Sequence, residues 1–158
     1  MMEQSILPRS SRDHELSCDQ LAACACHLLH SEMAVITQVT GKTQRMLGSH
    51  GLSGPLVQIC QGPLAQSICG HAAEMGVPLV IGNGLTHPLV NRHPAVTDLG
   101  IVSYIGHPLR DGRGPVRGVI SVCNTRPRDW SEDDSRRLAV LARLAVQVLR
   151  HARFAPAA

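Results

Sequence analysis

Aromatic residues are scarce in this sequence: Tyr104, Trp130 and Phe154 are the only three among 158 residues. A hydrophobic core must therefore consist mainly of Leu, Val, Ile, Ala and Met side chains. The scarcity also argues against binding of single-stranded nucleic acid, which stacks its bases on aromatic side chains. The formal net charge is only +3, and no basic run is longer than Arg136-Arg137. Because nucleic-acid-binding proteins carry clustered positive charge, we predict no nucleic-acid partner.

Long apolar runs are absent as well. No stretch approaches the roughly 18 apolar residues of a membrane-spanning helix, and the apolar segment Ile6–Pro8 is too short for a signal peptide. The six cysteines include no CxxC pair, which favours reduced thiols over a disulfide framework. We therefore expect a cytoplasmic protein with no membrane partner.

The remaining composition fits one globular domain. Hydrophobic residues make up 44% of the chain and charged residues 17%, which suits a protein with a sizeable core. Residues 1–14 contain no periodic pattern, so we predict a flexible leader there. The predicted domain covers residues 15–152, and residues 153–158 form a tail.

Both ends of this domain have the pattern of a helix. Ser131 followed by Asp134 has the spacing of a capping box, and Trp130 before it suits a hydrophobic staple. Ser17 followed by Gln20 repeats the capping-box spacing near the N-terminus. The predicted terminal helices are residues 16–30 and 131–152.

The C-terminal helix has an apolar stripe with spacings of three, four and three. Its members are Leu138, Leu141, Ala145 and Val148. This spacing is that of a coiled-coil seam, which would make a homodimer. It also suits a helix that packs on a sheet of the same chain, and the sequence leaves both interpretations open.

Alternating and β-branched segments predict strands between the helices, with two hairpins at Gly41-Lys42 and at Asp111-Gly112-Arg113-Gly114. Both alternating rows of the last two strands are apolar, so the sheet should be covered on both faces. A further helix is predicted from Pro63 to a C-cap at Gly76. The predicted strands are residues 34–39, 43–47, 79–81, 101–110 and 115–124.

Residues 82–98 form the longest irregular stretch and contain several His, Pro and Gly residues. Loops of this length inside a compact domain commonly bind ligands or act as lids. Several segments in and around this loop resemble, in their order, the GAF family of sensory domains over about residues 15–150. They are ICGHA (68–72), PLVI (78–81), HPLVN (87–91), PAV (94–96), SYIGHPLR (103–110), GVISVC (118–123) and PRDWS (127–131).

The resemblance implies an α+β, GAF/PAS-like fold. It implies a central antiparallel sheet of five or six strands with the N- and C-terminal helices on one face. A small-molecule pocket would lie on the other face under residues 62–98. Tyr104 and His107 have opposite alternation, so only one of them can point into that pocket. The candidate ligand-binding residues are Cys69, His71, His93, Asp98, Tyr104 and His107.

The function implied is that of a sensor in bacterial-type signal transduction, with no catalytic residues. The ligand and any cofactor are left unidentified by the sequence. No effector domain is evident, so we expect output through rearrangement of the terminal helices, through homodimerisation, or through a histidine kinase or phosphatase that acts in trans.

Three alternatives stay open. The first is a free methionine-R-sulfoxide reductase, a GAF enzyme, because Cys60 and Cys69 resemble two of its cysteines; its nucleophilic cysteine is missing from residues 98–101. The second is a haem-binding sensor, for which His87, His93 and His107 are the candidate ligands. The third is a protein-interaction module with no ligand. A covalently attached bilin is not expected, because residues 82–100 contain no cysteine.

Overall fold

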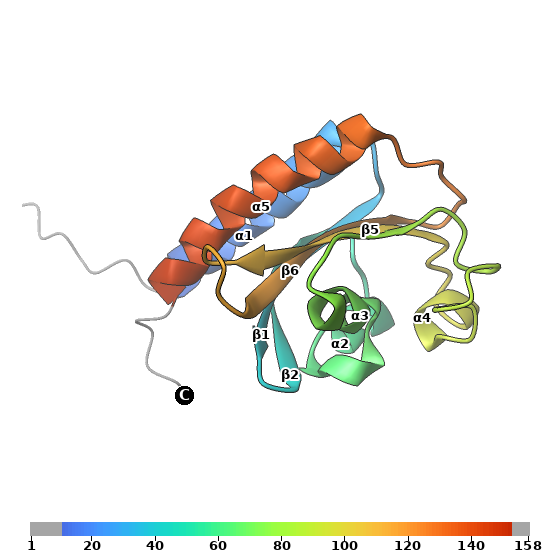
Figure 1. Cartoon of the computed structure of the whole chain (residues 1–158), viewed down its shortest axis with the longest axis horizontal. Coiled ribbons are helices and arrows are strands. Elements are labelled where there is room, and N and C mark those ends of the chain that lie inside the picture. The colour runs from blue at the N-terminus through green and yellow to red at the C-terminus, as the bar shows by residue number, and fades with distance from the viewer. Residues whose placement is uncertain (1–10, 153–158) are drawn as a thin grey trace, which may run out of the picture.

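The computed structural model describes the backbone of residues 11–152 and the side chains of residues 18–150. A six-stranded sheet separates two layers, with α1 and α5 side by side on one face and α2, α3 and α4 on the other (Figure 1). The elements in order are α1 (Ser11–Leu28), β1 (Met33–Thr40), β2 (Thr43–His50), α2 (Pro55–Ile59), β3 (Gly62–Pro63), η1 (Leu64–Gln66), α3 (Ile68–Met75), β4 (Leu79–Ile81), α4 (Pro94–Thr97), β5 (Ser103–Arg110), β6 (Val116–Asn124) and α5 (Glu132–Ala152).

The sheet has the strand order β3-β2-β1-β6-β5-β4, and all of its neighbouring strands are antiparallel. The two central strands β1 and β6 are far apart in sequence and pair through Ile36 and Ile120. The predicted α+β class, with an antiparallel sheet and both terminal helices on one face, is confirmed.

Alternation along the central strands divides the core in two. Ile105 and Ile120 point toward α1 and α5, whereas Tyr104 and Cys123, which are register partners, point toward the other layer. All four side chains are at most 7% exposed. The prediction that this sheet is covered on both faces is therefore correct. We call the side that carries Tyr104 the lid face and the side that carries Ile105 the helix face.

The capping box predicted for α5 is present. The Ser131 backbone N–H donates to Asp134 Oδ2 at 2.9 Å, and the Asp134 N–H donates to Ser131 Oγ at 3.1 Å. Helices α1 and α5 run antiparallel, because Arg137 near the start of α5 donates to the carbonyl of Leu28, the last residue of α1, at 3.1 Å.

The apolar stripe of α5 packs within the chain. Leu138, Leu141 and Ala145 are at most 3% exposed and belong to one cluster with Ala22 and Ala25 of α1. They cannot also form the seam of a dimer, so the coiled-coil interpretation of this stripe is wrong. The exposed apolar residues of α5 are instead Val140 and Leu144, at 55% and 47% exposure.

Several boundaries differ from the predictions. Helix α1 begins at Ser11, so residues 11–14 of the predicted leader are helical, while residues 1–10 lie outside the described part. The predicted helix from Pro63 begins only at Ile68, because Pro63 pairs with Thr43 in the sheet and Ser67 caps the helix by accepting from the Gly70 N–H. Its end at Gly76, with φ of 67°, is as predicted. Within residues 11–152, no helix combines the length and apolarity needed to span a membrane.

Candidate functional site

A cluster of hydrogen-bonding side chains lies in the middle of the lid face. It joins α3, β5 and β6: the Tyr104 hydroxyl donates to Cys69 Sγ at 3.2 Å, and Cys69 Sγ lies 3.5 Å from Ser121 Oγ. All three residues are at most 4% exposed. The structure therefore brings the predicted site residues Cys69 and Tyr104 into direct contact. Cys69 belongs to the 62–98 segment predicted to cover the ligand, and Tyr104 belongs to the sheet.

The Tyr104 ring lies on the sheet over Gly106, two residues along the same strand. A Cβ atom built at Gly106 would lie 2.4 Å from the phenol oxygen and 2.8 Å from Cζ. No other residue type therefore fits at position 106 while Tyr104 keeps this position. Burial and the neighbouring Cys69 thiol raise the pKa of the Tyr104 phenol well above its usual 10.0, so it is a neutral hydrogen-bond donor at physiological pH.

Two more thiols belong to the same side of the sheet. Cys123 is in the lid-face cluster, and the partly buried Cys60 packs against it. Burial, with a smaller contribution from Cys69, raises the pKa of the Cys60 thiol to about 12. Burial likewise raises the pKa values of Cys69 and Cys123. Because the thiolate is the reactive form, this environment suppresses thiol chemistry.

His93 and His71 lie at the edge of this face. His93 Nδ1 accepts from the Ala95 N–H at 3.0 Å and so caps α4. Burial lowers the pKa of His93, and the nearby His71 lowers it further. The Gln66 backbone raises this pKa and so offsets part of the shift. Its Nε2 is buried without a hydrogen bond of normal geometry. Asp98 is exposed and accepts from the Thr97 hydroxyl, away from the Tyr104 cluster.

His107 lies on the helix face, with its Nε2 3.2 Å from the Ser135 hydroxyl of α5. Burial lowers its pKa. The structure thus places Tyr104 on the lid face and His107 on the opposite one. Among the haem candidates, His87 accepts from the Leu89 N–H and forms a turn, as His93 does. Because His107 is on the other face, these three histidines do not converge on one site.

No group of three His, Cys, Asp or Glu side chains within the described residues is arranged to hold a metal ion. Sequence reasoning also missed Ser121 and Gly106 as parts of the site. Alternation along β6 could have placed Ser121 beside Cys123, and the pairing of Gly106 with Ser121 brings both next to Tyr104.

Residues 125–131 connect the lid face to both terminal helices. The Trp130 indole N–H donates to the Ile81 carbonyl at 3.1 Å, and the Arg128 N–H donates to the Gly82 carbonyl at 2.9 Å. These two carbonyls belong to the end of β4, where the 82–98 loop begins. The segment therefore holds the start of that loop.

The Arg128 side chain makes the connection to the helices. Its guanidinium donates to the Leu29 carbonyl and, at 2.8 Å, to Ser31 Oγ, just after α1. It also pairs with Asp134 of the α5 capping box at 3.1 Å and lies 4.3 Å from the centre of the Trp130 ring. One side chain thus contacts the end of α1 and the start of α5.

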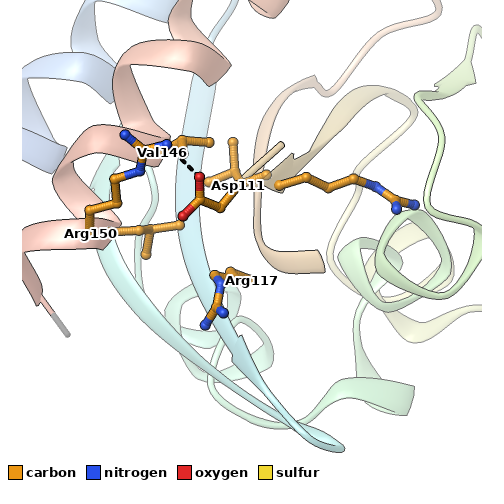
Figure 2. A pocket seen from close by; sticks show the side chains of 7 residues that line it. Asp111, Arg117, Val146 and Arg150 are labelled. Carbon is orange, nitrogen blue, oxygen red and sulfur yellow. Dashed lines mark hydrogen bonds and ion pairs between the residues drawn. The ribbon is translucent and has the colours of Figure 1, made fainter. Parts of the chain in front are cut away.

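A small hollow lies at the opposite end of α5, between this helix and the β5–β6 hairpin (Figure 2). Asp111 and Arg150, which form an ion pair, line it together with Arg117 and Val146. Its volume of about 10 Å³ suits at most a single water molecule. It is therefore not a candidate for the small-molecule site.

Known proteins share this architecture. The family model described as GAF domain matches residues 17–150. No curated protein matches the sequence.

Several solved structures share the fold at low sequence identity. The GAF domain of a phosphoenolpyruvate-protein phosphotransferase from Acinetobacter has a TM-score of 0.74 at 21% identity, covering 89% of this chain and 84% of that chain. The free methionine-R-sulfoxide reductase from Neisseria meningitidis, in complex with its substrate, has a TM-score of 0.71 at 20% identity, covering 92% and 82%. A domain described as part of a two-component sensor histidine kinase protein from Sinorhizobium meliloti has 0.71 at 17% identity, covering 89% and 92%.

Proposed function

Because this chain belongs to the GAF domain family, whose model matches residues 17–150, we propose that it is a sensory domain and not an enzyme. It binds a small molecule on the lid face, between the sheet and residues 62–98. Solved relatives with this fold include both a domain of a sensor kinase protein and a sulfoxide reductase. This chain's own residues distinguish between these two roles.

The observation that carries the proposal is the double attachment of residues 125–131. Trp130 and Arg128 donate hydrogen bonds to the end of β4, where residues 82–98, the lid loop, begin. The Arg128 guanidinium also contacts the end of α1 and the start of α5. A ligand that shifts this loop must either strain these bonds or move the helix ends with it. Signal transfer needs such an element, whose position depends on both the site and the output.

The output surface is the outer side of the helix pair. The exposed large apolar residues of the two helices are Leu28 of α1 and Val140 and Leu144 of α5, at 37%, 55% and 47% exposure. Large exposed apolar side chains on neighbouring helices suit association with another helical surface. A second copy of this chain, or a histidine kinase or phosphatase in trans, is the partner class that we propose.

The reductase is the second candidate, and one observation favours it: Cys60, Cys69 and Cys123 gather on the lid face. The reaction needs a thiolate that attacks the sulfoxide sulfur and a second thiol that resolves the product. Burial raises the pKa of all three thiols, and two of the three are buried. These thiols are protonated at neutral pH, which supports the sensory role instead.

Native mass spectrometry with an absorbance scan, on protein purified without denaturant, tests the proposal directly. A retained small mass, with altered amide exchange at the start of α5 after its removal, would support ligand sensing. A Soret band would identify haem as the ligand. Turnover of free methionine sulfoxide with a thiol reductant would overturn the proposal in favour of the reductase. Protein that shows neither a bound ligand nor turnover would favour the remaining alternative, an interaction module with no ligand.

A further inference from the structure

The proposed ligand site already contains one organic group of ligand size, the side chain of Tyr104. Its ring lies on Gly106 and its hydroxyl donates to Cys69 Sγ at 3.2 Å. The phenol is thus positioned as a bound small molecule would be: a flat apolar body on the sheet and one polar atom in a hydrogen bond. Ser121 Oγ, 3.5 Å from the same sulfur, supplies a second polar partner.

Burying a charged molecule at the position of the Tyr104 ring would be unfavourable in free energy. Among the described buried side chains, Asp134 alone carries a formal charge, and it pairs with Arg128 outside this cluster. The buried polar residues around Tyr104 are the neutral Cys69 and Ser121. A charged group without a partner is strongly disfavoured in such surroundings. The site therefore suits a neutral molecule.

Resting on the function proposed above, we propose that Tyr104 is an internal occupant of the ligand site. The ligand displaces the phenol ring from Gly106 and takes over its hydrogen bond with Cys69, whose sulfur also contacts Ser121. The ligand is accordingly an uncharged molecule with a flat apolar body of about the size of one aromatic ring and one hydroxyl or carbonyl group. Amino acids and nucleotides, which are charged, fall outside this class.

The ligand then competes with the Tyr104 ring for the place on Gly106. The free energy needed to move the ring lowers the observed affinity. The apparent affinity of a ligand falls with the fraction of protein that is competent to bind it. Removing the Tyr104 side chain should therefore strengthen binding of a molecule that resembles it. The probe is p-cresol, which reproduces the tyrosine side chain, and toluene is its counterpart without the hydroxyl.

The first experiment measures p-cresol and toluene binding to the Tyr104→Ala protein by calorimetry. We expect p-cresol to bind about tenfold more tightly to this variant than to the wild type, and more tightly than toluene does. A merely hydrophobic cavity would give the opposite order, since toluene is the less soluble of the two in water. Ile105→Ala is the matched control: its side chain is 0% exposed and lies on the helix face. The control should prefer toluene.

The second experiment needs no destabilising substitution. Tyr104 is the only tyrosine of the chain, so full-length protein labelled with 3-fluorotyrosine gives its ¹⁹F signal from this site alone. Addition of p-cresol should produce a second resonance, at the position of a solvent-exposed ring, whose intensity follows the p-cresol concentration. Tyr104→Phe, which keeps the ring and removes the hydroxyl, should bind p-cresol more tightly than the wild type because its ring leaves more easily.

Different outcomes separate this inference from the proposed function. A preference of Tyr104→Ala for toluene, or a ¹⁹F signal that stays unchanged while a ligand is bound, would overturn the internal occupant and leave the sensor intact. A retained ligand with a net charge would do the same. Displacement of Tyr104 by p-cresol without any change in amide exchange at the start of α5 would support the occupant and contradict the sensory output.

Discussion

Trp130 donates its indole N–H to the carbonyl of Ile81 at 3.1 Å, which joins a residue two positions before α5 to the last residue of β4. This bond spans the two layers of the fold, because β4 leads into the lid loop and α5 covers the opposite face of the sheet. The Arg128 guanidinium lies 4.3 Å from the centre of the same indole ring and contacts the end of α1 and the start of α5. The PRDWS segment before α5 therefore contacts the end of β4 and both terminal helices.

Replacing Arg128, which precedes α5, should destabilise the domain more than replacing an exposed arginine on α5. Arg128→Ala leaves Asp134 buried without its ion-pair partner and removes donors from the carbonyl of Leu29. We expect a loss of about 2 kcal/mol in the free energy of unfolding. Arg136→Ala removes only exposed ion pairs with Glu132 and Asp133 and should cost less than about 0.5 kcal/mol. Urea denaturation measures both, and equal losses would contradict the role of Arg128.

Gly106→Ala should displace Tyr104. The added Cβ would lie 2.4 Å from the phenol oxygen, so either the ring or the strand must move. We expect a loss of about 1–3 kcal/mol, the usual cost of overpacking a core. The double variant Gly106→Ala/Tyr104→Ala separates the causes. If the ring is the obstacle, the two losses will be far from additive; additive losses would mean that Gly106 serves the backbone alone.

The sequence predicts the parts of this fold whose signals are local. The capping box of Ser131 and Asp134 and the left-handed C-cap at Gly76 were both found from neighbouring residues, since each is complete within one helix end. The start of α3 was missed because Pro63 also suits a first helical turn. In the structure Pro63 pairs with Thr43, which lies twenty residues earlier in the chain and outside any local pattern.

The site was less predictable for the same reason. Alternation separates Tyr104 from His107, but it does not tell which of them faces the ligand, because both rows of β5 are apolar. The answer depends on which face α5 covers, and Ser135 of α5 is the residue that meets His107. Likewise, the contact between Cys69 and Tyr104 follows from how α3 packs on the sheet, which no spacing in the sequence specifies.

The stability of the domain should fall as the pH decreases below the usual histidine pKa of 6.5. Burial lowers the folded-state pKa of His107, so the unfolded chain takes up the proton first as the pH falls. His107→Gln should therefore lose less stability than the wild type between about pH 7 and about pH 5. Urea midpoints measured across this range test the difference, and parallel curves for His107→Gln and the wild type would contradict it.

Cys24 should be the first thiol to react with iodoacetamide in the folded protein. It is exposed on α1, whereas burial raises the pKa of Cys60 to about 12 and also raises the pKa values of Cys69 and Cys123. Peptide mass spectrometry after brief alkylation near neutral pH identifies the labelled residue. Cys24→Ser should remove the fast phase. Labelling of Cys69 as fast as that of Cys24 would mean that the lid-face thiols are reactive, and would strengthen the reductase hypothesis.

The helix pair should be the surface through which the domain associates. Val140 and Leu144 lie one turn apart on α5, are about half exposed and take no part in the buried stripe. Val140→Glu/Leu144→Glu should therefore abolish a homodimer at micromolar concentration and change the free energy of unfolding by no more than about 0.5 kcal/mol per site. Analytical ultracentrifugation measures the association.

The matched control for this surface is Leu85→Glu/Leu89→Glu, which changes two exposed leucines in the loop on the other side of the sheet. It should leave the association unchanged, because these two leucines do not belong to the helix pair. A dimer that survives the α5 substitutions and is lost with the loop substitutions would move the interface to the lid. In that case the ligand would regulate assembly directly, and the contacts of residues 125–131 would serve stability alone.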